Sequence, residues 1–155
     1  MRNIAAKLFI GIAITAIGVF GADSTLGTWK YNAAKSKSTS ANPIKSQTDV
    51  RETTADGGLK LTRTGEMMDG TAVNYSFTYK FDGQDYPVTG APFDSISVKR
   101  IDADTTNWDI RKTGEKFHFT GQTVISKDGK TMTQTSEGTD AEGKPVAQTN
   151  VFDKQ

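Results

Sequence analysis

The sequence predicts an all-β protein: an antiparallel up-and-down meander closed into a barrel of about nine strands. Apolar residues fall on every second position between Thr71 and Phe81, which is the side-chain period of a strand. Residue pairs that suit tight turns separate this run from its neighbours. After residue 22, no segment shows the apolar period of a helix.

The run between Thr71 and Phe81 has the strongest alternation. Its apolar residues, expected on one face that must be covered, are Val73, Tyr75, Phe77, Tyr79 and Phe81. Shorter alternations occur at Leu59 and Leu61, Ile96 and Val98, Trp108 and Ile110, and Phe117 and Phe119. We therefore expect strands at residues 26–31, 47–54, 59–66, 71–82, 95–101, 105–112, 116–126, 130–137 and 145–153.

Turn sequences lie where these runs end, and each contains a glycine that tolerates positive φ angles. They are Asp56-Gly57-Gly58, Asp69-Gly70, Asp82-Gly83, Asp128-Gly129 and Glu142-Gly143. Neighbouring strands should therefore pair as antiparallel hairpins. Such a meander leaves two unpaired edges unless its first strand pairs with its last, so we expect a barrel. Residues 32–45 and 84–94 interrupt the hairpins and are predicted to be long loops.

Residues 1–22 have the three parts of a secretory signal peptide. A basic start at Arg2 and Lys7 precedes the apolar run of residues 8–20, and small residues follow up to Ala22. The alternative is a membrane anchor, but the apolar run is shorter than the roughly 20 residues that a spanning helix needs. We expect cleavage near Ala22 and a protein located in the periplasm or outside the cell.

The remaining residues, 23–155, should form one soluble domain, which we expect to be monomeric. The chain has 19 Lys and Arg against 18 Asp and Glu, and the predicted signal holds two of the bases and no acid, so the mature part has a formal net charge of −1. This balance argues against a nucleic-acid partner or, after signal cleavage, a membrane partner, because both require clustered positive charge. Cysteine is absent, so stability must come from a core and closed backbone pairing.

The first strand opens with Gly27-Thr28-Trp29-Lys30, which is similar to the Gly-x-Trp opening of lipocalins and fatty-acid-binding proteins, the calycin group of barrels. The ending Val151-Phe152-Asp153-Lys154 is similar to that of the fatty-acid-binding branch. This resemblance implies that Trp29 closes one end of the barrel. Over nearly the whole mature chain, including residues 81–90 and 126–130, the sequence also resembles a family of small exported bacterial proteins of unassigned function.

The sequence departs from both calycin branches at positions linked to their barrels and ligands. Lipocalins pack a late-strand Arg on the opening Trp, but no Arg follows Arg111 in this chain. Fatty-acid-binding proteins clamp a carboxylate with an Arg-x-Tyr pair in the last strand, where this chain has Asn150-Val151-Phe152. They also insert a helix pair after the first strand, whereas residues 32–45 are poor helix formers. These departures argue against the carboxylate clamp but not against the barrel.

The late strands carry polar residues on both faces, as at residues 131–136 and 147–150. In a barrel this pattern predicts either a partly polar lumen for a small amphipathic or polar ligand, or a narrow barrel whose Thr and Gln side chains bond one another. The candidate ligand-binding residues, chosen as aromatic or cationic groups on strands, are Tyr75, Tyr79, Trp108, Arg63 and Arg100.

Arg63 and Arg100 are spaced an even number of positions from their apolar strand neighbours, so they should lie on the same strand face as those neighbours. Two alternatives stay open for each side chain. Either it lies at a solvated rim, or it points inward and requires a carboxylate partner or an anionic ligand.

No catalytic or metal site is indicated, and we expect neither an enzyme nor a cofactor. His118, the only histidine, alternates with Phe117 and Phe119 and should face outward. Two functions remain. The first is an exported, lipocalin-like protein that binds or scavenges a small ligand in its lumen. The second is a secreted or envelope interaction or inhibitor module that uses loops 32–45 and 84–94 on a solid barrel.

Overall fold

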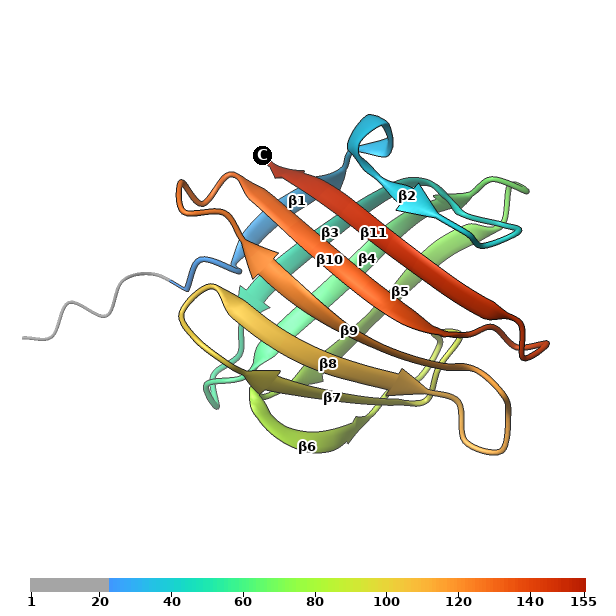
Figure 1. Cartoon of the computed structure of the whole chain (residues 1–155). Coiled ribbons are helices and arrows are strands. Elements are labelled where there is room, and N and C mark those ends of the chain that lie inside the picture. The colour runs from blue at the N-terminus through green and yellow to red at the C-terminus, as the bar shows by residue number, and fades with distance from the viewer. Residues whose placement is uncertain (1–22) are drawn as a thin grey trace, which may run out of the picture.

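The computed structural model describes residues 23–155, and the predicted signal peptide lies outside this range. A single antiparallel sheet wraps around an interior (Figure 1). Its strands are β1 (Gly27–Tyr31), β2 (Lys37–Ser38), β3 (Ile44–Thr53), β4 (Leu59–Met67), β5 (Ala72–Tyr79), β6 (Asp82–Pro87), β7 (Ser95–Arg100), β8 (Thr105–Arg111), β9 (His118–Ile125), β10 (Thr131–Thr139) and β11 (Pro145–Lys154). Within the described range the one helical element is a 3₁₀ turn at Ala33–Lys35, and no helix there is long and apolar enough to cross a membrane.

Ten strands form the barrel wall in the order β5-β4-β3-β1-β11-β10-β9-β8-β7-β6, and β2 pairs with β11 outside this path. As predicted, the first strand pairs with the last. The structure places Trp29 opposite Lys154 in this ladder. The wall is open at one place, because β5 and β6 are consecutive in the chain but share no ladder. The antiparallel all-β barrel is therefore confirmed, with ten strands in its wall where the sequence predicts about nine.

The predicted loop at residues 84–94 is wrong in its first half, because Asp82–Pro87 forms β6. This segment contains glycine, proline and two aspartates, which are rare in strands, so it carries no strand pattern. A sheet edge tolerates them, since β6 pairs only with β7 and has an irregular register between Asp82 and Asp85. Asp82-Gly83 likewise begins a strand, whereas the other four predicted turns connect antiparallel neighbours.

A fully buried cluster, which we call the closing cluster, lies toward one end of the barrel. Its members are Trp29, Ile125, Met132 and Phe152. The indole Nε1–H of Trp29 donates to the carbonyl oxygen of Thr25 at 2.9 Å. The Lys154 Nζ lies 5.0 Å from the centroid of the same ring, so a lysine stands where the lipocalin resemblance implies an arginine. Trp29 is therefore buried within this cluster, and its barrel-closing role stays a prediction.

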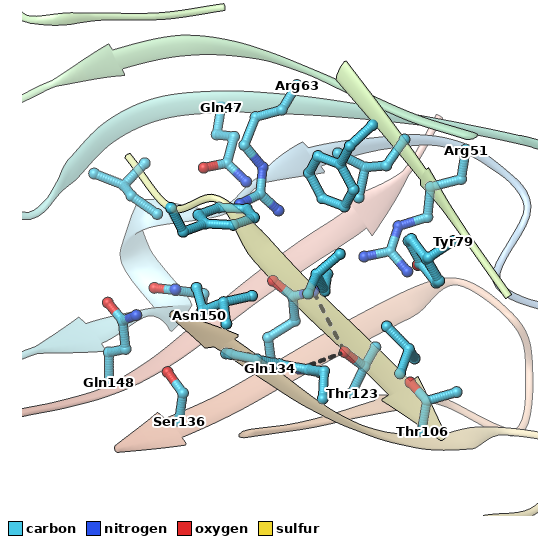
Figure 2. A pocket seen from close by; sticks show the side chains of 18 residues that line it. Gln47, Arg51, Arg63, Tyr79, Thr106, Thr123, Gln134, Ser136, Gln148 and Asn150 are labelled. Atoms are coloured by element: carbon cyan, nitrogen blue, oxygen red, sulfur yellow. Dashed lines mark hydrogen bonds between the residues drawn. The ribbon is translucent and has the colours of Figure 1, made fainter. Parts of the chain in front are cut away.

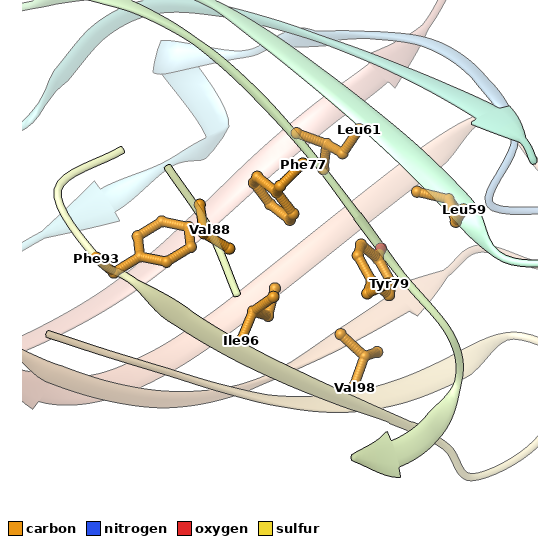
Figure 3. Close-up of a cluster of buried hydrophobic side chains, with 8 residues drawn as sticks. All are labelled: Leu59, Leu61, Phe77, Tyr79, Val88, Phe93, Ile96 and Val98. Atoms are coloured by element: carbon orange, nitrogen blue, oxygen red, sulfur yellow. The ribbon is translucent and has the colours of Figure 1, made fainter. Parts of the chain in front are cut away.

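The larger apolar cluster lies on the side of β4, β5 and β7 (Figure 3). It consists of Leu59, Leu61, Phe77, Tyr79, Val88, Phe93, Ile96 and Val98. The predicted inward face of β5 is confirmed, because Phe77 and Tyr79 are buried and Tyr75 packs against the cluster. Phe93, from the loop after β6, meets the rings of Tyr75 and Phe77 edge-on at 6.0 and 5.6 Å. Side-chain packing therefore connects β5 with β7 and the loop before it, across the gap between β5 and β6 where the backbone ladder is interrupted.

Candidate ligand-binding cavity

The barrel interior contains two adjoining chambers. The inner chamber, about 120 Å³, lies between the larger apolar cluster and strands β9 to β11 (Figure 2). The outer chamber, about 420 Å³, lies toward the end of the barrel opposite Trp29 and reaches loop residues such as Ser40, Gly90 and Asp140. The chambers meet at a shared set of residues, which we call the neck: Ile44, Gln47, Arg63, Phe93, Ile110 and Gln148. Only the outer chamber reaches the roughly 300 Å³ at which small-molecule pockets begin.

One wall of the inner chamber is polar. It is formed by Thr106, Thr123, Gln134, Ser136, Gln148 and Asn150. The Thr123 hydroxyl accepts hydrogen bonds from Trp108 Nε1 at 3.2 Å and from Gln134 Nε2 at 3.3 Å (Figure 2). Both sequence alternatives therefore hold in part. Some Thr and Gln side chains bond one another, and a chamber remains between them and the apolar wall.

A charged network joins β3 and β4 at the neck. Asp49 is fully buried and lies opposite Arg63 in the ladder. Its carboxylate accepts from Arg63 Nε at 2.8 Å, from Arg63 Nη2 at 2.7 Å and from Gln47 Nε2 at 2.9 Å. Burial opposes the charge on Arg63, but the Asp49 carboxylate outweighs it and raises the pKa of the guanidinium. Arg63 therefore takes the inward alternative, with a carboxylate of the protein as its partner.

Arg51 points into the inner chamber from the same face of β3, with 4% of its side chain exposed. Its Nη2 is 3.9 Å from the nearer Asp49 oxygen, and its Nε has no hydrogen-bond partner. Figure 2 shows this guanidinium beside Tyr79. Burial raises the pKa of the Tyr79 hydroxyl, so the phenol stays protonated at neutral pH. The inner chamber thus holds a cation with unused donors next to a neutral ring.

Four of the five predicted ligand-binding residues line the chambers. Arg63 lines both, Tyr79 and Trp108 line the inner chamber, and Tyr75 lines the outer chamber. The Trp108 ring has room because it lies against Gly121 on β9, where a Cβ atom would overlap the indole.

Arg100, the fifth predicted residue, is not among the side chains that line either chamber. Its Nη2 pairs with Asp23 at 2.5 Å, and its guanidinium lies 4.0 Å from the centroid of Phe81. It therefore ties the start of the described chain to β7. Its carboxylate partner, Asp23, precedes the first strand, so a strand pattern alone does not reveal the pair.

Sequence reasoning misses the polar row of β3, which consists of Gln47, Asp49 and Arg51. It also misses Phe93 at the neck, because Phe93 lies in the loop that follows an unrecognised strand. Strand pairing could have revealed this row. Trp29 on β1 lies opposite Asp49 on β3, so both side chains point to the same face of the sheet, and an inward Trp29 places Asp49 inward as well.

His118 lies on the exposed side of β9, with its Nε2 2.8 Å from Asp109 Oδ2. Within residues 23–155, no group of three or more His, Asp or Glu side chains could hold a metal ion. The lining of the inner chamber offers aromatic, amide, hydroxyl and guanidinium groups.

Comparison with known proteins finds no matching family model and no matching curated protein. Several solved structures do match. The wild-type fluorescent protein UnaG is 12% identical with a TM-score of 0.52, covering 85% of this chain and 98% of that one. As-p18, an extracellular fatty acid binding protein, is 12% identical with a TM-score of 0.51, covering 86% and 97%. A Schistosoma mansoni fatty acid binding protein in complex with arachidonic acid is 15% identical with a TM-score of 0.50, covering 85% and 96%.

The fold is that of the fatty-acid-binding proteins. Identities this low show the fold alone, so the ligand has to be argued from the interior of this chain. In place of the Arg-x-Tyr pair that the resemblance implies for the last strand, β11 places Asn150 in the inner chamber and Phe152 in the closing cluster. The interior cations of this fatty-acid-binding-protein-like barrel come instead from β3 and β4.

Proposed function

We propose that the protein is an exported, non-enzymatic binder of a small amphipathic ligand, which it carries or scavenges in the barrel interior. The observation that carries the proposal is the pair of chambers that meet at the neck and extend from the interior to one end of the barrel. Their lining combines aromatic rings with polar groups, which is the usual composition of small-molecule sites. The predicted signal peptide supports export.

The two walls of the inner chamber favour a ligand with both polar and apolar parts. A purely apolar ligand would cover Gln134 and Asn150 without replacing their hydrogen bonds to water, which is costly. A purely polar ligand would gain nothing from Phe77 and the other apolar groups on the opposite wall. An amphipathic ligand gains on both walls. The complex of a protein of the same fold with arachidonic acid is a precedent for such a ligand.

The alternative function, a loop-based interaction module, presupposes a solid barrel. The described barrel contains chambers, so this premise is not met. The loops named for that function instead surround the outer chamber, through Asn42 and Pro43 on one side and Gly90 and Pro92 on the other. These residues are better placed to control access to the interior.

The proposal is tested by native mass spectrometry of the protein purified from its own host. We expect a bound small molecule on the natural protein. The Gln148→Trp variant places a large side chain at the neck and should lose this mass. Ala147→Trp is the matched control, because Ala147 precedes Gln148 on β11 and lies exposed on the other face of the strand.

Retention of the mass by Ala147→Trp and its loss from Gln148→Trp would support binding in the lumen. A ligand mass that Gln148→Trp leaves unchanged would place the ligand elsewhere and overturn the proposal. Circular dichroism spectra of both variants show whether the barrel has folded. If Gln148→Trp does not fold, Ile110→Trp at the same neck provides the second test.

A further inference from the structure

The guanidinium of Arg51 is buried, and most of its hydrogen-bond donors have no partner in the protein. Among the described residues, its Nε is the single buried side-chain nitrogen or oxygen without a hydrogen-bond partner. Its one ionic contact is the 3.9 Å approach to Asp49, whose oxygens already accept from Arg63 and Gln47 at 2.7 to 2.9 Å. Since a guanidinium has five N–H donors, Arg51 presents unused donors to the inner chamber.

The charges of the interior are also unbalanced. Arg51 and Arg63 are the charged residues that line the inner chamber, and both are cationic. Asp49 lies behind them and neutralises one of the two. One positive charge therefore remains in a largely buried position, where an uncompensated charge is unfavourable. A single negative charge supplied from the chamber would balance it.

We propose that the ligand carries one carboxylate group and that this group binds Arg51 in the inner chamber; the inference rests on the proposed function. A carboxylate is planar, so it can accept from Nε–H and a neighbouring Nη–H of the same guanidinium at once. A doubly charged phosphate would overbalance the single positive charge beside Asp49. The inner chamber of about 120 Å³ takes the head group and the apolar segment next to it, and the rest of the apolar part of the ligand passes Phe93 into the outer chamber.

The site lies on a different wall from the clamp that the fatty-acid-binding resemblance implies. That clamp belongs to the last strand, where this chain has Asn150, Val151 and Phe152. Arg51 belongs to β3, which is separated from β11 by β1 in the sheet order. The direction of the bound ligand is therefore set by residues of β3 and not of β11.

The test is isothermal titration calorimetry of the mature protein at about pH 7.5, where octanoate is ionised. The probes are octanoate and 1-octanol, which differ in the charged group, and acetate, which lacks the chain. We expect octanoate to bind at least about tenfold more tightly than 1-octanol, as a charge-assisted hydrogen bond provides. Arg51→Met should reduce octanoate affinity to that of 1-octanol and leave 1-octanol binding unchanged.

Two further variants sharpen the result. Arg51→Lys keeps the charge without the planar fork, so its octanoate affinity should be intermediate. Arg111→Met makes the same substitution at an Arg on the exterior and should change nothing. Thermal unfolding shows that each variant is folded, and removal of an unpaired buried charge is not expected to prevent folding.

Each outcome has a distinct meaning. Equal binding of octanoate and 1-octanol, insensitive to Arg51→Met, would overturn the carboxylate site and leave the proposed function intact. Acetate binding as tight as that of octanoate would show an isolated anion site and overturn the head-group assignment. Failure of both eight-carbon probes to bind would overturn this inference, whereas the native mass spectrometry still tests the proposed function separately.

Discussion

Asp49→Asn should be one of the most destabilising single changes in the barrel. The substitution keeps the shape of a fully buried side chain but removes the charge that holds two hydrogen bonds from Arg63 and lies 3.9 Å from Arg51. Removing one partner of a buried ion pair costs about 3–5 kcal/mol. Arg63 is 18% exposed and can recover some hydration, but Arg51 at 4% cannot. We therefore expect a loss of about 3 kcal/mol or more in the free energy of unfolding.

Urea denaturation measures this loss, with Asp85→Asn as the matched control. Asp85 pairs with Arg111 on the exterior, where ion pairs contribute little, so the control should unfold like the natural protein. The double variant Asp49→Asn/Arg63→Met should lose less stability than the two single variants added together, because it removes both charges of the pair. Equal effects of Asp49→Asn and Asp85→Asn would refute the buried network as a source of stability.

Further expected outcomes concern the closed end of the barrel and the start of the chain. Trp29→Ala should lower the free energy of unfolding by about 3–5 kcal/mol, measured by urea denaturation, because it empties the centre of the closing cluster. The pKa of the Asp23 carboxyl lies below its usual 3.8, because hydrogen bonds from Thr25 and the charge of Arg100 outweigh burial. The stability that the ionised Asp23 carboxyl contributes is present above pH 3.8 and is lost as pH falls through the lower pKa of the folded state. Asp23→Asn should therefore be destabilising at about pH 6 in thermal unfolding, and its effect should shrink as pH falls below 3.8. N-terminal sequencing of exported protein should find a start within a few residues of Ala22, and intact Met1 in the membrane fraction would contradict the signal prediction.

The barrel could be predicted because strand period and turn chemistry are local signals. The alternation through Tyr75 and Phe77 depends only on which face of β5 is covered, and the structure covers that face. Strand β6 could not be predicted in this way. Its Gly83 and Pro87 are tolerated because it pairs on one side only, and this edge position is a property of the whole sheet.

The candidate site could be predicted in part, since Arg63, Tyr79 and Trp108 line the inner chamber. For Arg63, the signal is parity with the apolar neighbours on its own strand. Arg100 also lies on the strand face of its apolar neighbours, yet it lines neither chamber and pairs with Asp23. The strand face alone does not show which end of the barrel a position occupies.

Gln47, Asp49 and Arg51 escape prediction because alternation is ambiguous when an inward face is polar. Their strand also carries Thr48, Val50 and Glu52 on the other face, so hydrophobicity gives no reason to turn the charged row inward. The cross-strand register removes the ambiguity. Once Trp29 is placed inside, its pairing with Asp49 places the carboxylate inside as well, and residues two positions away on either side must follow it. The cations of the interior then appear as a consequence of strand pairing, before any cavity is considered.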